Sequence, residues 1–587
     1  MSAKPDSVEV PIPDRSEGTW GSDLMAEMLR DLGFRHVALN PGSSFRGLHD
    51  SLVNRLGNAN PSMLLCLHEE HAVSIAHGWA KVTGEPMAVI LHANVGLMHG
   101  SMAIYNAWCD RVPMVIFGAT GPVDARKRRP WIDWIHTSRD QASMVRPYTK
   151  WDDQPASLEA SLAAMVRANV IARTAPQAPT YVCFDVTVQE EKVVNNPWRP
   201  EPTLHQAPED PSPSETQLET LEKLLNEAKR PVFMMGRVSR SEEDWAARIA
   251  LAERYNAQVV TDIKTGAAFP TDHPLHAGPP SFFIAERPAR ALADADLIVA
   301  FDWVDTAGDL RQVGAEGSLV NVSLDHQLAN GWSLDHMAQP AAKLHIAALP
   351  DTVINMMVRR LDLSVTRLIP AVPRASGQPC KVQNAITMDE LSSALATGLS
   401  GEIISLVRLP LGWDGGSWHF QHPLDYLGYD GGAGIGSGPG MLVGAALALT
   451  ETDRIPVAVL GDGDVMMGVS ALWTAARYGI PFILVVCNNR SYFNDEVHQE
   501  KVAVTRGRPV ENKAIGQAIT GPDIDFSAIA RAQGLEAIGQ VTTPGELIEA
   551  LRTAITIFRE GKPVVIDARV EPEYAKAMSE GMTKSDH

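Results

Sequence analysis

Residues 457–493 read VAVLGDGDVMMGVSALWTAARYGIPFILVVCNNRSYF, and this stretch decides the fold. Two short apolar runs are separated by a segment of helical periodicity, which predicts a parallel strand–helix–strand unit. Asp462 follows the first run and Asn489 follows the second. Because open α/β sheets bind ligands beyond the carboxyl ends of their strands, we expect the two side chains to converge.

The same alternation of strands and helices extends along the chain and predicts an α/β protein of three successive parallel-sheet domains. We place an N-terminal domain at 18–195, a proline-rich linker at 196–217 and a middle domain at 218–362. A second linker at 363–380, a C-terminal domain at 381–575 and a tail at 576–587 complete the chain. The strand candidates are HVALN, MAVILH, PMVIFG and PTYVCFDV in the first domain, RPVFMMG, AQVVTD, DLIVAFD and SLVNVSLD in the second, and IPVAVLGDGD, PFILVVCNN and KPVVIDARV in the third.

Composition restricts the class of partner. The net charge of −19 argues against nucleic acid, which requires clustered basic residues. The N-terminus lacks an apolar signal core, and no apolar run is long enough to span a membrane. The five cysteines are scattered without metal-binding spacing, which fits reduced thiols. We therefore expect a cytoplasmic protein with a small-molecule partner.

The GDG and NN motifs indicate a metal site. A carboxylate and an amide oxygen suit Mg²⁺, which completes its coordination with phosphate and water, so the implied ligand is a diphosphate. Taken alone, GDG could be a tight turn and NN a helix cap. Together they resemble the diphosphate and metal motif of thiamine diphosphate enzymes. The resemblance implies that Asp462, Asn489 and the backbone carbonyl of Ser491 ligate Mg²⁺, and that Asn488 shapes the turn.

The resemblance assigns further residues to the cofactor. Gly461, Gly463 and Asp464 of the same motif would lie at its diphosphate. In LLCLHEEHAVSIAHGWAKVTGEP, Glu69 would hydrogen-bond N1′ of the aminopyrimidine and promote loss of the C2 proton. Glu70 is the alternative, although an acidic residue in a first helical turn is often only a dipole partner.

A glycine-rich segment, YDGGAGIGSGPGMLVGAALAL, precedes a predicted helix. It superficially matches a dinucleotide fingerprint, but no strand precedes it. In thiamine diphosphate enzymes such a segment passes beneath the cofactor, and Ile435 would be the bulky residue that holds the cofactor bent. A packed core isoleucine is the alternative.

Within the superfamily the chain resembles benzoylformate decarboxylases, and more distantly acetolactate synthases, through all three domains. The motifs LNPGSS, LHEEHAVSIAHGWA, VILHANVG, YNAW, GDGD, SALWTAARYGIP and NN carry the resemblance. It implies that Ser43 contacts the substrate carboxylate and that His92 exchanges a proton with the carbonyl-derived oxygen, a task suited to a pKa near neutrality. A turn residue and a hydrogen-bonded histidine at a strand end are the alternatives.

Two departures leave the substrate open. Ala307 stands nearest the position where a second active-site histidine is expected from the middle domain. After the NN motif, polar residues replace apolar pocket positions, although a solvated helix face would explain them equally; these are Asn494, Asp495 and His498. Three further histidines could approach the cofactor or simply pack, namely His99, His419 and His422.

The expected function is non-oxidative decarboxylation of a 2-oxo acid to an aldehyde and CO₂, with thiamine diphosphate and Mg²⁺. A carboligase or a 2-hydroxy ketone lyase is the alternative. A flavin-containing oxidase ranks lower because the middle domain shows no flavin pattern, and an inactive binding protein ranks lower because Glu69, Asp462 and Asn489 are all present. The resemblance also implies a homodimer or homotetramer with shared active sites.

Overall fold

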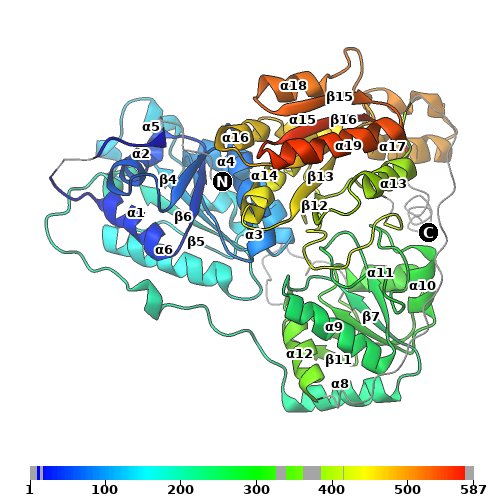
Figure 1. Ribbon diagram of the computed structural model, residues 1–587. Helices are drawn as coiled ribbons and strands as arrows, with labels where there is room; N and C mark the ends of the chain where they lie inside the picture. The colour runs from blue at the N-terminus through cyan, green and yellow to red at the C-terminus, as the bar shows by residue number, and fades with distance from the viewer. Residues whose placement is uncertain (1–8, 14–16, 326–338, 361–384, 414, 575–587) are drawn as a thin grey trace.

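The computed structural model describes residues 9–13, 17–325, 339–360, 385–413 and 415–574. It contains three parallel sheets in three successive α/β domains, as predicted (Figure 1). The predicted second linker and the C-terminal tail lie outside the described residues.

The N-terminal domain is built on a six-stranded parallel sheet of order β2-β1-β3-β4-β6-β5. Its strands β3, β4 and β6 are buried throughout, because helices cover both faces of the sheet. The strands are β1 (His36–Leu39), β2 (Ser62–Leu65), β3 (Ala88–Leu91), β4 (Met114–Thr120), β5 (Trp151–Asp153) and β6 (Pro179–Asp185). The helices are α1 (Gly21–Asp31), α2 (Arg46–Asp50), α3 (Glu69–Thr83), α4 (Ala93–Cys109), α5 (Ile132–Ile135), α6 (Leu158–Arg173) and α7 (Val186–Gln189).

The middle domain has a five-stranded parallel sheet of order β11-β10-β9-β7-β8. Its strands are β7 (Pro231–Met235), β8 (Gln258–Thr261), β9 (Leu297–Phe301), β10 (Ser318–Val322) and β11 (Leu344–Ile346). Its helices are α8 (Glu215–Glu227), α9 (Glu242–Tyr255), α10 (Glu286–Ala293), α11 (Thr306–Val313) and α12 (Pro350–Arg360). Helix α8 begins inside the predicted linker 196–217, which corrects that boundary. The reason is a capping box in which Ser214 and Gln217 satisfy each other's backbone amides.

The C-terminal domain has a five-stranded parallel sheet of order β12-β13-β14-β16-β15. Its strands are β12 (Ile404–Arg408), β13 (Ile455–Gly461), β14 (Ile483–Asn488), β15 (Glu536–Val541) and β16 (Val564–Arg569). Its helices are α13 (Met388–Gly398), α14 (Gly438–Leu449), α15 (Asp462–Gly468), α16 (Ala471–Tyr478), α17 (Phe493–Thr505), α18 (Phe526–Ala532) and α19 (Pro544–Arg559). Strands β13 and β14 pair in parallel with Gly461 opposite Cys487, as the deciding stretch predicts.

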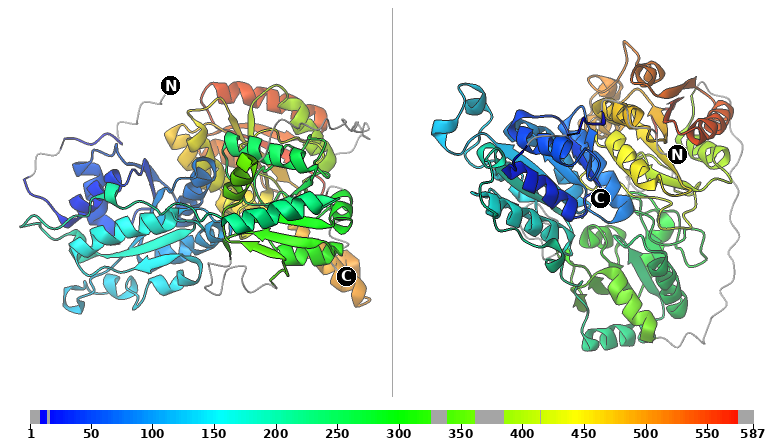
Figure 2. Two further views of the ribbon diagram at one scale, coloured as in Figure 1. Left: turned by 90° about the horizontal axis from the view of Figure 1, so that it is seen from below. Right: turned by 60° about the vertical axis from the view of Figure 1, so that its left-hand side comes forward.

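The N-terminal and C-terminal domains share one hydrophobic core. Helices α3 and α14 cross at this boundary and lie side by side in both ribbon figures (Figures 1 and 2). The crossing is close because glycines face backbone: a Cβ at Gly78 would lie 2.0 Å from the carbonyl oxygen of Met441, and one at Gly444 would lie 1.9 Å from that of Ile75. The two outer domains therefore form one packed body.

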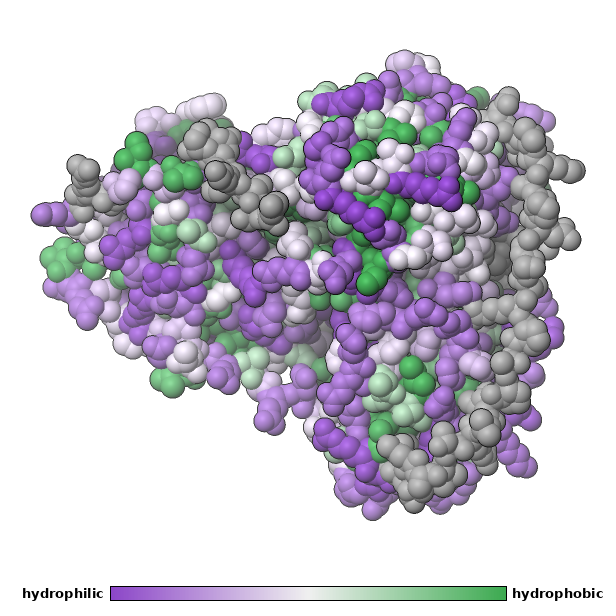
Figure 3. Space-filling view, in the orientation of Figure 1, coloured by the Kyte–Doolittle hydropathy of each residue, from purple (hydrophilic) through white to green (hydrophobic). Residues whose placement is uncertain are grey.

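Hydrophilic residues cover most of the face shown in the space-filling view (Figure 3). Among the described residues, no helix is both long and apolar enough to cross a membrane.

Candidate active site

The metal-binding residues predicted in the C-terminal domain lie at the ends of β13 and β14. The Asp462 carboxylate accepts hydrogen bonds from the Gly463 amide (2.8 Å) and the Arg490 amide (2.6 Å), so it reaches directly to the loop after β14. The Asn489 side-chain oxygen accepts from the Ser491 amide at 2.9 Å. Burial raises the pKa of Asp462 to about 6. This set of oxygen donors fits a hard divalent cation such as Mg²⁺.

Neighbouring side chains fix this loop. Asn488 donates to Asp567 at 3.0 Å, in keeping with a role in shaping the turn. The Ser491 hydroxyl donates to the Glu496 carboxylate. The Asp464 carboxylate accepts from the Gly436 amide at 2.6 Å. The GDGD motif is thus tied to the glycine-rich segment.

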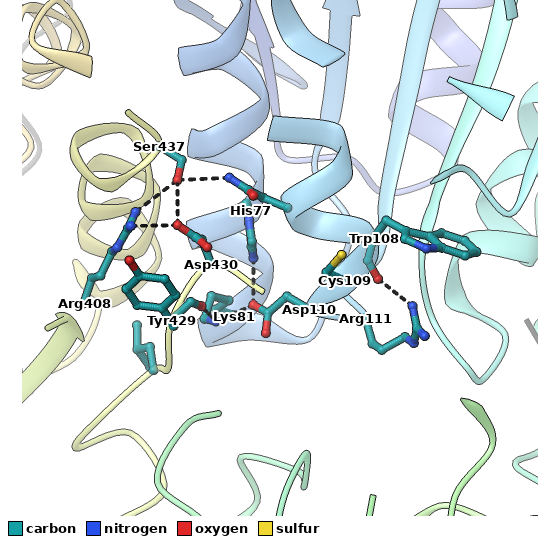
Figure 4. A network of polar contacts seen from close by, with 12 residues as sticks. His77, Lys81, Trp108, Cys109, Asp110, Arg111, Arg408, Tyr429, Asp430 and Ser437 are labelled. Atoms are coloured by element: carbon teal, nitrogen blue, oxygen red, sulfur yellow. Dashed lines mark hydrogen bonds and ion pairs between the residues drawn. The ribbon is translucent and has the colours of Figure 1, made fainter. Parts of the chain in front are cut away.

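The glycine-rich segment that carries Ile435 is anchored by polar contacts from two domains. Asn106 of α4 donates to the Gly434 carbonyl at 3.1 Å and accepts from the Gly434 amide at 3.2 Å. Arg408 pairs with Asp430 at 2.7 Å and donates to Ser437 at 3.1 Å (Figure 4). These contacts therefore fix the backbone that carries the half-buried Ile435.

Figure 4 also shows the contacts that hold this segment against the N-terminal domain. Lys81 and His77 of α3 both contact the Asp110 carboxylate (Figure 4). Lys81 also donates to the carbonyl of Tyr429, the first residue of the glycine-rich segment, at 2.6 Å. These buried contacts fix the segment relative to α3, the helix that begins at Glu69.

Glu69 begins α3 beyond the end of β2 and is 7% exposed. One carboxylate oxygen lies 3.0 Å from Nδ1 of His99 on α4. The other faces Gly96, where a Cβ would lie 3.0 Å from the Glu69 oxygen and 3.2 Å from Cβ of His92. Glu69 and His92 therefore both lie beside Gly96, where the lack of a side chain lets the two approach.

The neighbourhood of Glu69 is rich in histidine. His68 stacks on His99 with ring centroids 4.8 Å apart. His68, Glu69 and His99 offer ligand atoms within 4.8 Å of one another, so this group could also hold a metal ion. The sequence placed His99 only generally near the cofactor and gave no sign of the link to His68, because contacts between α3 and α4 depend on how the helices pack.

Glu70 faces a different domain. Its carboxylate oxygen would lie 3.3 Å from a Cβ at Gly436, and burial followed by the charge of Asp464 raises the pKa of Glu70 to about 7. Within the described part of the chain, no hydrogen bond or ion pair joins Glu69 to Asp462 or Asn489. We call Glu69 with its neighbours the N-terminal half-site, and Asp462, Asn489 and Ser491 the C-terminal half-site.

Ser43 and His92 line one hollow in the N-terminal domain. Ser43 opens the 3₁₀ turn η2 (Ser43–Phe45) beyond β1 and is exposed, whereas Ser44 is buried. The Ser44 hydroxyl lies 2.9 Å from Nδ1 of His92 and accepts from the Ala93 amide at 3.1 Å. Burial, followed by the nearby His136, lowers the pKa of His92. The sequence analysis missed Ser44 and His136; the second serine of NPGSS was the one available signal.

Other predicted positions lie apart from these half-sites. Ala307 is in α11 of the middle domain. His422 lies 3.2 Å from Glu242 and packs between the middle and C-terminal domains. On α17, Asp495 and His498 are exposed in the single chain, and Asn494 accepts from the Tyr574 hydroxyl at 2.8 Å.

A larger cavity, of about 680 Å³, lies between the N-terminal and middle domains. Its lining includes Arg111, Arg237, Asp302 and Asp325, which pair with one another. It contains none of the candidate catalytic or metal-binding residues, so its size does not make it the active site.

Three parallel α/β domains, with an oxygen-donor site in the third and a buried glutamate in the first, match the architecture of thiamine diphosphate-dependent enzymes. Family models agree domain by domain. The N-terminal TPP binding domain of thiamine pyrophosphate enzymes matches residues 19–144, the central domain 218–343 and the C-terminal TPP binding domain 412–568. The chain belongs to the thiamine pyrophosphate enzyme family.

Curated relatives span nearly the whole chain. Benzoylformate decarboxylase of Pseudomonas aeruginosa is 27% identical over 92% of this chain and 97% of its own length. An acetolactate synthase large subunit of Haemophilus influenzae is 24% identical and covers 94% of each. A thiamine diphosphate-dependent 4-hydroxybenzoylformate decarboxylase of Rhodococcus jostii has the same fold, with a TM-score of 0.78 at 22% identity over 95% of this chain and all of that one.

Proposed function

We propose that this protein catalyses non-oxidative decarboxylation of a 2-oxo acid, giving an aldehyde and CO₂, with thiamine diphosphate and Mg²⁺. The observation that carries the proposal is that Glu69 and His92 both lie beside Gly96. The carboxylate that would activate the cofactor and the histidine that would act on the substrate then lie close together. The benzoylformate decarboxylase relative supports the same reaction class.

The C-terminal domain would bind the diphosphate end of the cofactor. Asp462, Asn489 and the Ser491 carbonyl would hold Mg²⁺, and Ile435 would support the rings. When bound, thiamine diphosphate supplies a nucleophilic carbon and an electron sink for cleavage of the carbon–carbon bond. Asp464, Gly461 and Gly463 would line the diphosphate, with Asp464 also holding the Gly436 amide.

The N-terminal domain would supply the proton-transferring groups. Since His99 holds one Glu69 oxygen, the other is available to the cofactor pyrimidine. The Ser44 hydroxyl accepts the Ala93 N–H and lies 2.9 Å from Nδ1 of His92. In the proposal it donates its own proton to Nδ1, so that Nε2 of His92 carries the N–H. His92 would donate that proton to the substrate carbonyl oxygen, and the Ser43 hydroxyl would bind the substrate carboxylate.

A carboligase is the second candidate, because acetolactate synthases match the chain over nearly its full length. It would use the same residues and differ in whether a second carbonyl compound or a proton captures the product of decarboxylation. A 2-hydroxy ketone lyase would run that ligation backwards. In each case we propose a homodimer or homotetramer, with an active site shared between subunits.

The test is incubation of the full chain with thiamine diphosphate, Mg²⁺ and a panel of aromatic, aliphatic and polar 2-oxo acids, with CO₂ and products followed by NMR. A matching aldehyde supports the decarboxylase, and a hydroxy ketone the carboligase. Glu69→Gln should abolish turnover and hydrogen–deuterium exchange at C2 of the bound cofactor. Glu70→Gln is the matched control, and retention of activity by Glu69→Gln would remove the proposed role of Glu69.

A further inference from the structure

His136 stands directly against His92. It follows α5 at the carboxyl side of the sheet, and its ring centroid lies 4.7 Å from that of His92, with the rings at 86°. Both histidines line the hollow that Ser43 opens into. Two imidazoles therefore lie near Ser43, whereas the sequence resemblance predicted one from this domain.

The segment that carries His136 is held in place. Asn94, two residues after His92, donates to the Ile135 carbonyl at 3.2 Å. Asp133, only 2% exposed, accepts from the Arg129 amide at 2.7 Å and pairs with the Arg129 guanidinium at 2.9 Å. These contacts on both sides of α5 fix the position of His136 beside His92.

One ring nitrogen of His136 lacks a partner. Nδ1 is buried and, among the described residues, makes no hydrogen bond. Buried polar atoms nearly always have a partner, so an unpaired ring nitrogen beside His92 points to a partner from outside the chain. His92 differs, because its Nδ1 lies 2.9 Å from the Ser44 hydroxyl. The two histidines thus differ in their contacts: Nδ1 of His92 has a partner within the chain and Nδ1 of His136 has none among the described residues.

We propose that His136 is a second catalytic histidine, which delivers the proton that becomes the aldehyde hydrogen. The inference rests on the proposed decarboxylation. In that reaction the bond between the carboxylate carbon and the carbonyl carbon breaks, CO₂ leaves, and the electron pair left behind ends in a new C–H bond. His136 supplies the proton and regains one from water. His92 protonates the carbonyl oxygen and takes that proton back as the aldehyde forms, so one proton is consumed per turnover.

This assignment addresses the absence of a histidine at Ala307. The middle domain offers no imidazole at that position, but His136 places one in the same pocket as His92 from the N-terminal domain itself. Two proton transfers, to oxygen and to carbon, then have two separate donors.

The test compares His136→Gln with wild type, using the 2-oxo acid of the panel that wild type turns over fastest. A positioned acid contributes about 100-fold or more, so we expect aldehyde formation to fall about 100-fold. In a single turnover CO₂ should appear at close to the wild-type rate. With added benzaldehyde as acceptor, the ratio of hydroxy ketone to aldehyde should rise at least about tenfold, because protonation of the carbon becomes slower and capture by benzaldehyde does not.

Controls separate this role from a structural one. His136→Gln and His136→Phe should bind the cofactor and exchange its C2 proton as wild type does, because Glu69 is unchanged. His49→Gln, on α2 of the same domain and outside the hollow, should behave as wild type. If both His136 variants form aldehyde at the wild-type rate and with the wild-type product ratio, the role of His136 is overturned and the proposed function is not. Absence of C2 exchange or turnover in wild type would overturn the proposed function, and the inference with it.

Discussion

The hydrogen bond between His99 and Glu69 determines how the Glu69 carboxylate is oriented. The hydrogen bond from His99 orients the carboxylate, but His99 has a side chain that is 59% exposed in the single chain. A hydrogen bond of this kind contributes about 1 kcal/mol net, so His99→Ala should slow C2 exchange by roughly threefold to tenfold. His99→Asn, which keeps a donor of similar reach, should recover most of the rate. Equal rates in both variants and wild type would show that the contact does not orient Glu69.

The raised pKa of Glu70 predicts a pH-dependent stability. Its pKa is about 7 in the folded chain against an ordinary value of 4.5, chiefly because of burial. As pH rises from 4.5 to 7, the unfolded glutamate loses its proton while the folded one keeps it, so the free energy of unfolding falls across that window. Glu70→Gln removes this loss. Its Tm relative to wild type should be higher at about pH 8 than at about pH 5.

The contrasting outcome is a Tm difference that is the same at both pH values. It would show that Glu70 keeps an ordinary pKa and that the proximity of Asp464 has no energetic effect.

The position of a residue could be predicted from the sequence where a motif fixes a strand end. Asp462 and Asn489 follow adjacent buried strands, so their proximity was predictable from alternation alone. His136 was not predictable. It follows a four-residue helix far along the chain from His92, and only the packing of that helix against α4 brings the two rings together.

At the scale of elements, the predicted strands are confirmed where they are central. All the quoted apolar runs form strands. Five strands have no run among the quoted candidates, and all five lie at sheet edges: β2, β5, β11, β12 and β15. The residues of β5, β11 and β15 are largely half-buried or exposed and carry no continuous apolar run, so periodicity does not reveal them. Strand β12 was missed although it is buried throughout.

The crossing of α3 and α14 predicts a strong glycine requirement. Gly444→Ala would place a Cβ 1.9 Å from the Ile75 carbonyl oxygen, and backbone on both sides leaves the helices no alternative but to separate. Overpacking of this kind costs about 1–3 kcal/mol or more, so Tm should fall clearly. Gly545→Ala, near the start of α19 with no atom within 4 Å, is the matched control and should leave Tm nearly unchanged.

At the scale of the whole molecule, the two half-sites require explanation. Glu69 makes its contacts within the N-terminal domain, whereas Glu70 faces the glycine-rich segment of the same chain. We propose that the glutamate that activates a cofactor held by Asp462 and Asn489 comes from a second subunit. A dimer then has two composite sites, each with one half from each chain.

This arrangement predicts complementation between two inactive variants. Glu69→Gln leaves the C-terminal half-site intact, and Asp462→Ala leaves the N-terminal half-site intact. In a mixed dimer one composite site carries both substitutions and the other carries neither. Random reassociation makes about half of the dimers mixed, each with one wild-type site of two, so co-refolded or co-expressed variants should recover about a quarter of wild-type activity.

The mixture of separately purified homodimers, without subunit exchange, is the control and should stay inactive, since every site in it carries one substitution. A double variant Glu69→Gln/Asp462→Ala co-expressed with wild type should also give mixed dimers, but each of their sites is then damaged once. Activity per chain should therefore fall below half, to about a quarter, in that mixture. If each site were built from one chain, the first mixture would stay inactive and the second would keep half of the wild-type activity, which would place both half-sites in the same subunit.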